Sequence, residues 1–241
     1  MRRVRILALD STAKVCTAAL CEDTKLVTMK RENAGMTHSE MLLPMIESIL
    51  SDAGLTCADI DVFALSKGPG SFTGVRIGAA TVKGLCFGRE AACVGVSTLL
   101  ALAYNFIDSD GIVVSCMDAR RSQVYTAIFR VRDKEIERLS DDMAISIDEL
   151  ARKVCEYSSE KIYLSGDGAA LVYNKLKENP SLCVELDEEK AAQNAYSVAQ
   201  CAYRAYLAGE SVSDSELRPT YLRLAQAERE RLEKLGQLPK E

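Results

Sequence analysis

A strand, an acidic bend and a second strand occur twice in this chain, and this repetition limits the fold more than any other feature. Apolar runs at residues 4–10 and 15–21 are separated by the polar turn Ser-Thr-Ala-Lys, and the first run ends in an aspartate. About a hundred residues later, apolar runs at 112–117 and 123–130 are separated by Asp-Ala-Arg-Arg. Apolar runs bounded by turn residues are typical of buried strands. The repetition therefore predicts two related lobes, each opening with a hairpin.

Further apolar runs and helical periodicities fill the rest of the sequence. More strands are predicted at residues 25–29, 60–65, 91–96 and 161–164, and helices at residues 38–53, 73–87, 97–107, 148–157, 169–177 and 196–207. Strands separated by helices favour parallel pairing, so the opening hairpins should extend into mixed sheets flanked by helices. The predicted fold class is α/β. Residues 225–241 are dominated by Glu, Arg and Lys, which predicts a frayed helix or charged tail.

The net charge and the hydropathy of the chain argue against some functions. Its net charge is −5, whereas binding to a phosphate backbone depends on clustered Lys and Arg. We therefore expect a partner to carry most of any RNA binding. The sequence has no run of eighteen apolar residues, so no membrane span is expected. The N-terminus leads directly into the first strand, which argues against a signal peptide.

The cysteines indicate a reducing compartment. There are nine, they are scattered, and no C-x-x-C pair occurs among them. An odd number without the spacing of tetrahedral ligands argues against a disulfide framework or a zinc site. Most lie inside apolar runs, so we expect buried, reduced thiols in a cytoplasmic protein.

A glycine-rich segment at 68–74 leads into the helix predicted at 73–87. Its spacing is not that of a dinucleotide-binding loop, and Val75 stands where a P-loop needs lysine. The segment is therefore either an anion site at a helix N-terminus or a tight strand-to-helix turn. The helix carries small residues at Gly74, Gly78, Ala79, Ala80 and Gly84. Each interior glycine costs about 1 kcal/mol relative to alanine, so either internal packing or a helix of another subunit must approach closely.

Few side chains suit catalysis. His38 is the only histidine, the residue four positions later is Leu42, and no G-x-S-x-G sequence occurs. A metal site of the H-x-x-x-H type and a serine triad are therefore not expected, and His38 is interpreted as a capping or surface residue. Asp10 and Asp118 end apolar strands, where an aspartate either holds magnesium through water or caps a turn.

Four segments together resemble one known family. They are Leu9-Asp10-Ser11-Thr12, the run Met36-Thr37-His38-Ser39-Glu40 with Leu42-Leu43-Pro44, the block Lys67 to Gly78, and Met117-Asp118-Ala119-Arg120. Gly166-Asp167-Gly168 and Pro219-Thr220-Tyr221-Leu222-Arg223 also fit. The combination closely resembles the bacterial TsaB (YeaZ) family over residues 1–223.

This resemblance implies a two-lobed ASKHA fold, of the actin, Hsp70 and sugar-kinase type, and a non-catalytic role. TsaB proteins pair with the catalytic subunit TsaD and, with the ATPase TsaE, transfer a threonylcarbamoyl group to the adenosine beside the anticodon of ANN-decoding tRNAs. TsaD holds its metal with two histidines, of which the second corresponds to Leu42 here. The resemblance thus implies no cofactor or metal, indirect contact with tRNA, and lobes at 1–107 and 108–224 with the C-terminal helix packing back.

The resemblance also implies where the partner binds. The family uses the first two helices of the N-terminal lobe, which correspond to 38–53 and 73–87. The implied interface residues are His38, Met41, Leu42, Met45, Ile46, Ile49, Gly74, Val75, Ile77 and Gly78. The same surface is expected to allow a homodimer when TsaD is absent. On this interpretation, Gly78→Leu should block pairing and leave the lobe folded.

The resemblance further implies remnants of a nucleotide site. These are the phosphate-binding hairpins at Asp10-Ser11 and Asp118, and an adenosine loop at Gly166 and Gly168. Two other functions stay open. One is a stand-alone ATP-binding protein or kinase of this fold, and the other is a peptidase, for which neither a metal nor an activated nucleophile is evident.

Overall fold

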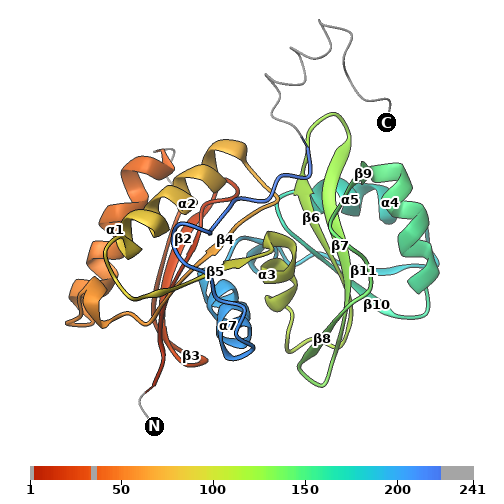
Figure 1. The fold of residues 1–241 in the computed structure, drawn as a ribbon. Helices are drawn as coiled ribbons and strands as arrows, with labels where there is room; N and C mark the ends of the chain where they lie inside the picture. Colours follow the sequence, from red (N-terminus) through yellow and green to blue (C-terminus); the bar gives the residue numbers. More distant parts are fainter. Residues whose placement is uncertain (1–2, 34–36, 224–241) are drawn as a thin grey trace, which may run out of the picture.

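The computed structural model describes residues 3–33 and 37–223, so the charged tail predicted at 225–241 lies outside the described residues. Two β-sheets stand side by side, and helices pack on both faces of each (Figure 1). The helices are α1 (His38–Asp52), α2 (Phe72–Cys86), α3 (Thr98–Tyr104), α4 (Ile147–Val154), α5 (Ala169–Leu176), α6 (Glu188–Ala191) and α7 (Ala195–Leu207), with short 3-10 turns at Cys57–Asp59 and Cys155–Tyr157.

The first sheet has five strands in the order β3-β2-β1-β4-β5. They are β1 (Arg5–Asp10), β2 (Cys16–Glu22), β3 (Lys25–Glu32), β4 (Val62–Ser66) and β5 (Ala92–Val96). The pairs β1–β2 and β2–β3 are antiparallel, whereas β4 is parallel to both β1 and β5. β1, β2 and β3 follow one another directly in the chain and form an antiparallel meander. β4 and β5 each follow a helix and are added in parallel, as the alternation of strands and helices predicts.

The second sheet repeats this order. Its strands are β6 (Gly111–Asp118), β7 (Gln123–Arg132), β8 (Glu135–Arg138), β9 (Met143–Ser146), β10 (Lys161–Ser165) and β11 (Cys183–Glu185). Along the sheet the order is β8-β7-β6-β10-β11, and β9 pairs with β7. β6 is antiparallel to β7 and parallel to β10, just as β1 is antiparallel to β2 and parallel to β4. The two-lobed fold predicted from the repeated hairpin is confirmed.

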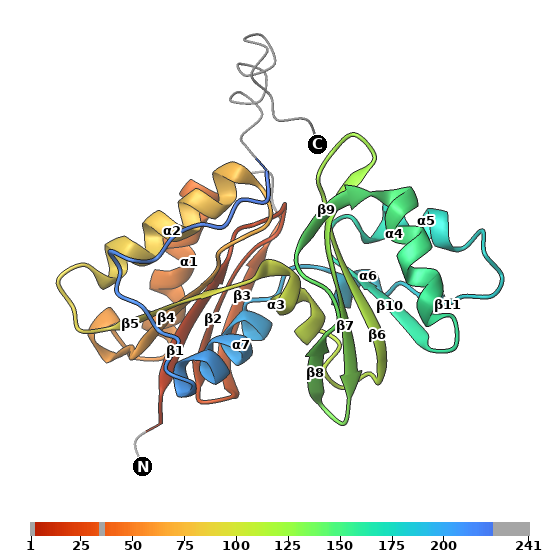
Figure 2. The same ribbon diagram turned by 45° about the vertical axis from the view of Figure 1, so that its right-hand side comes forward.

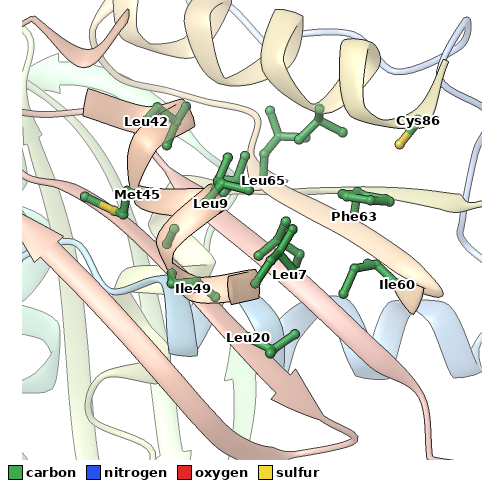
Figure 3. Packing of buried hydrophobic residues seen from close by; sticks show 14 of the residues in the cluster. Leu7, Leu9, Leu20, Leu42, Met45, Ile49, Ile60, Phe63, Leu65 and Cys86 are labelled. Carbon is green, nitrogen blue, oxygen red and sulfur yellow. The ribbon is translucent and has the colours of Figure 1, made fainter. Parts of the chain in front are cut away.

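Alternate residues of β1 enter different cores. Leu7 and Leu9 pack with apolar side chains of α1 and α2, and Figure 3 shows them beside Leu42, Met45 and Ile49 of α1. The intervening residues of β1 pack with α7 on the other face of the sheet. Because successive side chains of a strand point to opposite faces, the continuous apolar run of β1 indicates burial on both sides.

Helix α3 joins the two lobes. The ribbon of α3 lies between the two sheets (Figure 2). Its Ala101 and Tyr104 pack with the first sheet and α7, whereas Leu99 and Leu102 pack with the second sheet. α7 follows the second sheet in the sequence but covers the first. The lobe boundary between residues 107 and 108 stays a prediction, and by its packing α7 belongs with the first lobe.

Four short elements escaped the sequence analysis, namely β8, β9, β11 and α6. β8 and β11 lie at or near the edge of the second sheet and are mostly exposed, so they lack the apolar alternation that identifies a strand. Polar side chains and a glycine mark the two ends of α1. Glu40 accepts a hydrogen bond from the backbone N–H of Thr37 at 3.0 Å, and Gly54 has a φ of 64° after the last turn. Over the described ranges, the helices are too short or too polar to cross a membrane.

Candidate functional site

A cleft of about 1070 Å³ opens between the lobes. The first lobe contributes the turn after β1, including Lys14, and the start of α2 at Phe72; the second contributes Asp118, Arg120 and Tyr125. Asp167 and residues 220–223 complete its wall. Cationic, anionic and aromatic side chains therefore meet in one space, where an extended polar ligand or a peptide segment would fit.

Asp10 does not face this cleft. Its side chain is buried, Oδ1 accepts hydrogen bonds from the backbone N–H (2.9 Å) and hydroxyl (2.7 Å) of Thr12, and Oδ2 accepts one from the Ser66 hydroxyl at 2.6 Å. Burial raises the pKa of this carboxyl above its usual range, and the hydrogen bonds oppose that shift. Ser11 is equally enclosed, because its hydroxyl donates to the backbone carbonyl of Gly74. Both side chains thus stabilise the first hairpin, and their role in a vestigial phosphate site stays a prediction.

The second hairpin is more open to the cleft. The Asp118 carboxylate accepts hydrogen bonds from the backbone N–H of Arg120 at 2.7 Å and from its guanidinium at 3.1 Å. Asp167 Oδ1 accepts the backbone N–H of Asp118, and burial raises the pKa of the Asp167 carboxyl. Asp118 and Gly166 line the cleft, and their role in a vestigial nucleotide site stays a prediction. Gly168 instead packs closely against the backbone around Asp118.

The glycine-rich segment fits tightly against the first hairpin. The N–H of Ser71 donates to the carbonyl of Thr12 at 2.7 Å, and the Ser71 hydroxyl accepts from the N–H of Gly74 at 3.3 Å. A Cβ at Gly74 would overlap the carbonyl oxygen of Ser11, and one at Gly78 would lie 2.7 Å from the Ser11 hydroxyl. Of the two interpretations, the tight turn is the one these contacts favour. Gly74 and Gly78 permit internal packing, and their contact with a partner helix stays a prediction.

The apolar stripe of α1 also faces inward. Met41, Leu42, Met45, Ile46 and Ile49 are buried against the first sheet (Figure 3), and Val75 of α2 is buried as well. These side chains form the core of the lobe, and their contact with a partner stays a prediction. Periodicity identified the buried face of each helix, but it cannot distinguish burial in the same chain from burial in a complex.

The outward faces of α1 and α2 carry other residues. Leu43 is 48% exposed, Phe87 directly after α2 is 81% exposed, and no atom lies within 4 Å of a Cβ built on Gly84. Ile77 is half-buried between the two faces of α2. Sequence reasoning did not single out Leu43 or Phe87, although their position out of phase with the buried stripe was a usable signal.

His38 lies at the mouth of the cleft. Its Nε2 is 3.3 Å from the backbone carbonyl of Lys14, and the ring is partly exposed. The ring thus braces the start of α1 against the first hairpin, in keeping with its interpretation as a surface residue. Within residues 3–33 and 37–223, no group of three or more His, Cys, Asp or Glu side chains is arranged to hold a metal ion.

A C-terminal strap, residues 217–223, crosses from one lobe to the other. The N–H of Thr220 donates to the carbonyl of Lys67 at 2.7 Å, and the Tyr221 ring lies 4.9 Å from that of Phe72. Arg76 Nε donates to the Tyr221 hydroxyl at 3.0 Å. At the end of the strap, the Arg223 guanidinium lies 5.7 Å from the centre of the Tyr125 ring, which belongs to β7 of the second lobe. The strap therefore closes one side of the cleft.

Comparison with known proteins identifies the family. The family model described as TsaD, tRNA N6-adenosine threonylcarbamoyltransferase, matches residues 30–230. The tRNA threonylcarbamoyladenosine biosynthesis protein TsaB of Escherichia coli is 32% identical over 222 residues, which cover 91% of this chain and 95% of that protein. This chain belongs to the TsaB family. TsaB of Bacillus subtilis is 30% identical over 245 residues, covering 92% and 96% of the two chains.

The solved structures agree with the TsaB assignment. YeaZ from Pseudomonas aeruginosa superimposes with a TM-score of 0.77 at 26% identity, covering 91% of this chain and all of that one. Another structure from the same organism, described as an uncharacterized protein with similarity to peptidase YEAZ, matches equally well. The fold of this TsaB protein is thus the two-lobed ASKHA fold, with its mixed sheets related by the repeated strand order.

Proposed function

We propose that this TsaB protein is the non-catalytic partner subunit of a TsaD-type tRNA threonylcarbamoyltransferase. It takes part in threonylcarbamoyladenosine formation in the cytoplasm, together with the ATPase TsaE, and reaches tRNA through the complex. The family supports the pathway, because its curated members are named for the biosynthesis of this nucleoside. The observation that carries the pairing is the outward face of α1 and α2, which we define by Leu43, Ala80, Gly84 and Phe87.

This outward face has two properties of a helix-docking surface. Leu43 and Phe87 expose apolar side chains, and large apolar residues are enriched in the cores of protein interfaces. Gly84 lies inside α2, where glycine costs about 1 kcal/mol relative to alanine, yet within residues 3–33 and 37–223 no other part of the chain comes within 4 Å of a Cβ built there. This open space beside Gly84 forms a notch on the surface of α2. A helix of another subunit fits it, because helices with small residues at their contact can approach closely. The docking helices are those implied by the resemblance, but the side chains are on the opposite face.

A non-catalytic role is supported by the side chains around the cleft. A single histidine cannot supply a metal site of two histidines, and the residue one turn after His38 is the buried Leu42. A stand-alone kinase or ATPase of this fold would need the Asp10 carboxylate for its chemistry. Here that carboxylate accepts hydrogen bonds from Thr12 and Ser66. The cleft therefore lacks the open carboxylate that the kinase alternative needs at the first hairpin.

The activity test is threonylcarbamoyl transfer to tRNA. TsaD and TsaE are supplied with threonylcarbamoyl-adenylate, with and without this chain. We expect transfer only when the chain is added, and none from the chain alone. Transfer that is indifferent to the chain would overturn the partner-subunit proposal while leaving the family and the fold unchanged.

The surface test is Gly84→Arg. We expect the dissociation constant for TsaD to rise at least about tenfold, because a long charged side chain fills the notch and is desolvated on docking. Any homodimer formed through this face should weaken in parallel. Leu171→Arg, at an exposed site on α5 of the second lobe, is the matched control and should leave the affinity unchanged. Equal affinities of the two variants would place the contact elsewhere.

A further inference from the structure

Two cysteines meet where α2 ends. The Sγ atoms of Cys86 and Cys93 are 3.2 Å apart, and both side chains are buried. Cys86 is the last residue of α2, at the edge of the core cluster in Figure 3, and Cys93 is in β5. A disulfide needs the sulfurs about 2.05 Å apart, so they would have to approach by roughly 1 Å. Six residues separate them, of which 87–91 form the loop between α2 and β5.

The backbone on the Cys93 side is held firmly. Cys93 pairs with Phe63 of β4 on one side and exchanges two backbone hydrogen bonds with Val212 on the other, at 3.0 and 2.9 Å. The Cys86 side is looser, because residues 87–90 are exposed and one backbone hydrogen bond, from the N–H of Arg89 to the carbonyl of Cys86, holds the turn. Because this loop has few contacts, its opening is the local motion that we expect to expose the two sulfurs.

The environment suits thiol exchange. The contact with Cys86 lowers the pKa of Cys93, and Lys83 acts in the same direction, whereas burial and the charge of Asp214 act to raise this pKa. The pKa of Cys86 is raised by the same contact, since one sulfur keeps the proton while the other carries the charge. A thiolate is the attacking species in disulfide exchange, so Cys93 is suited to react first.

We propose that Cys86 and Cys93 form a redox pair that a small-molecule disulfide converts to an intramolecular disulfide. The Cys93 thiolate attacks one sulfur of the small disulfide, forming a mixed disulfide and releasing one thiolate. The Cys86 sulfur, after losing its proton, attacks Cys93 Sγ and releases the second. Two cysteine thiols are oxidised, and the small disulfide is reduced to two thiols. The bond ties the end of α2 to β5.

The position of the bond connects it to the outward face of α2. Phe87 follows Cys86 directly, and Gly84 precedes it by two residues. A disulfide that fixes this end of α2 is expected to change the position of the Phe87 side chain on the outward face. The oxidised protein should therefore bind TsaD with an affinity different from that of the reduced one. This consequence rests on the proposed function, whereas formation of the bond does not.

The test treats the folded, full-length protein with oxidised glutathione and blocks the remaining thiols with iodoacetamide. Trypsin cleaves after Lys83, Arg89 and Arg120, so the bond would join peptide 84–89 to peptide 90–120. We expect this linked pair in the mass spectrum and its loss on reduction. Because peptide 90–120 also contains Cys116, the link should persist in Cys116→Ala and vanish in both Cys93→Ala and Cys86→Ala.

Two outcomes would overturn the pair. One is glutathione adducts confined to the exposed Cys155 and Cys183, with Cys86 and Cys93 fully alkylated after unfolding. The other is a bond from Cys86 to Cys57, the partly buried thiol near this site. TsaD affinity is measured separately on oxidised and reduced protein. If the linked peptide forms but the affinity for TsaD does not change, the redox pair is supported and the proposed effect on TsaD binding is wrong.

Discussion

Replacing Gly74 by alanine should lower the free energy of unfolding by about 2 kcal/mol or more, although alanine is the better helix former. A methyl group at this position would overlap the carbonyl oxygen of Ser11, so the backbone of α2 or of the first hairpin must move. Overpacking against backbone costs about 3 kcal/mol, and the gain in helix propensity returns about 1 kcal/mol. Urea unfolding measures the change, and thermal unfolding should shift down by roughly 4–8 °C.

Two further glycines of α2 provide the controls. Gly84→Ala should raise stability by up to about 1 kcal/mol, because nothing opposes a methyl group there. The change in the free energy of unfolding for Gly78→Ala should fall between those of the other two variants. Its Cβ would meet the Ser11 hydroxyl, which can rotate away but then loses its hydrogen bond to Gly74. If Gly74→Ala and Gly84→Ala changed stability by the same amount, the internal explanation of Gly74 would be wrong.

The same geometry changes the meaning of the variant Gly78→Leu. On sequence grounds it should block pairing without disturbing the lobe. The space beside Gly78 is occupied by Ser11 and Leu65, so a leucine there is expected to damage the fold first. Gly84→Arg replaces it as the test of the outward face.

The layout of the fold could be predicted from the sequence because its signals are local. Apolar runs located the central strands β1, β2, β6 and β7, and helical periodicity located α1. β8 and β11 could not be predicted, since mostly exposed strands near a sheet edge have no apolar alternation. That α7 covers the first sheet depends on contacts between residues far apart in the sequence, which only the resemblance anticipated.

The candidate site was harder to predict, because side-chain direction decides it. Asp10 and Asp118 occupy equivalent hairpins in the sequence, yet one is enclosed by Thr12 and Ser66 and the other faces the cleft. Ser66 ends β4, far from Asp10 in the sequence, so no local pattern connects the two. Tyr221 and its partners Phe72 and Arg76 belong to quoted motifs, but only their contact across the chain shows that a strap exists.

Asp10→Ala should lower the free energy of unfolding by about 3 kcal/mol. The Ser66 hydroxyl and both donors of Thr12 would lose their acceptor in a buried space, and an unsatisfied buried donor costs about 1–3 kcal/mol. The alanine variant no longer has to bury a carboxyl group, which offsets part of the cost of these unsatisfied donors. Asp10→Asn should stay within about 1 kcal/mol of the unmodified protein at neutral pH, because the amide keeps an oxygen for Thr12 and Ser66 can accept from its nitrogen. Urea unfolding of the two variants side by side measures the difference.

The comparison with Asp10→Asn should also depend on pH. Burial raises the pKa of Asp10 in the folded protein above the ordinary value of 3.8, so the folded state binds its proton more tightly than the unfolded state. The stability that this proton provides is fully present below pH 3.8 and is lost as the pH rises through the folded pKa. The asparagine variant cannot ionise. Its stability relative to that of the unmodified protein should therefore increase as the pH rises through that window. If the unmodified protein gained instead, the hydrogen bonds from Thr12 and Ser66 would outweigh burial, and Asp10 would be held as a charged acceptor.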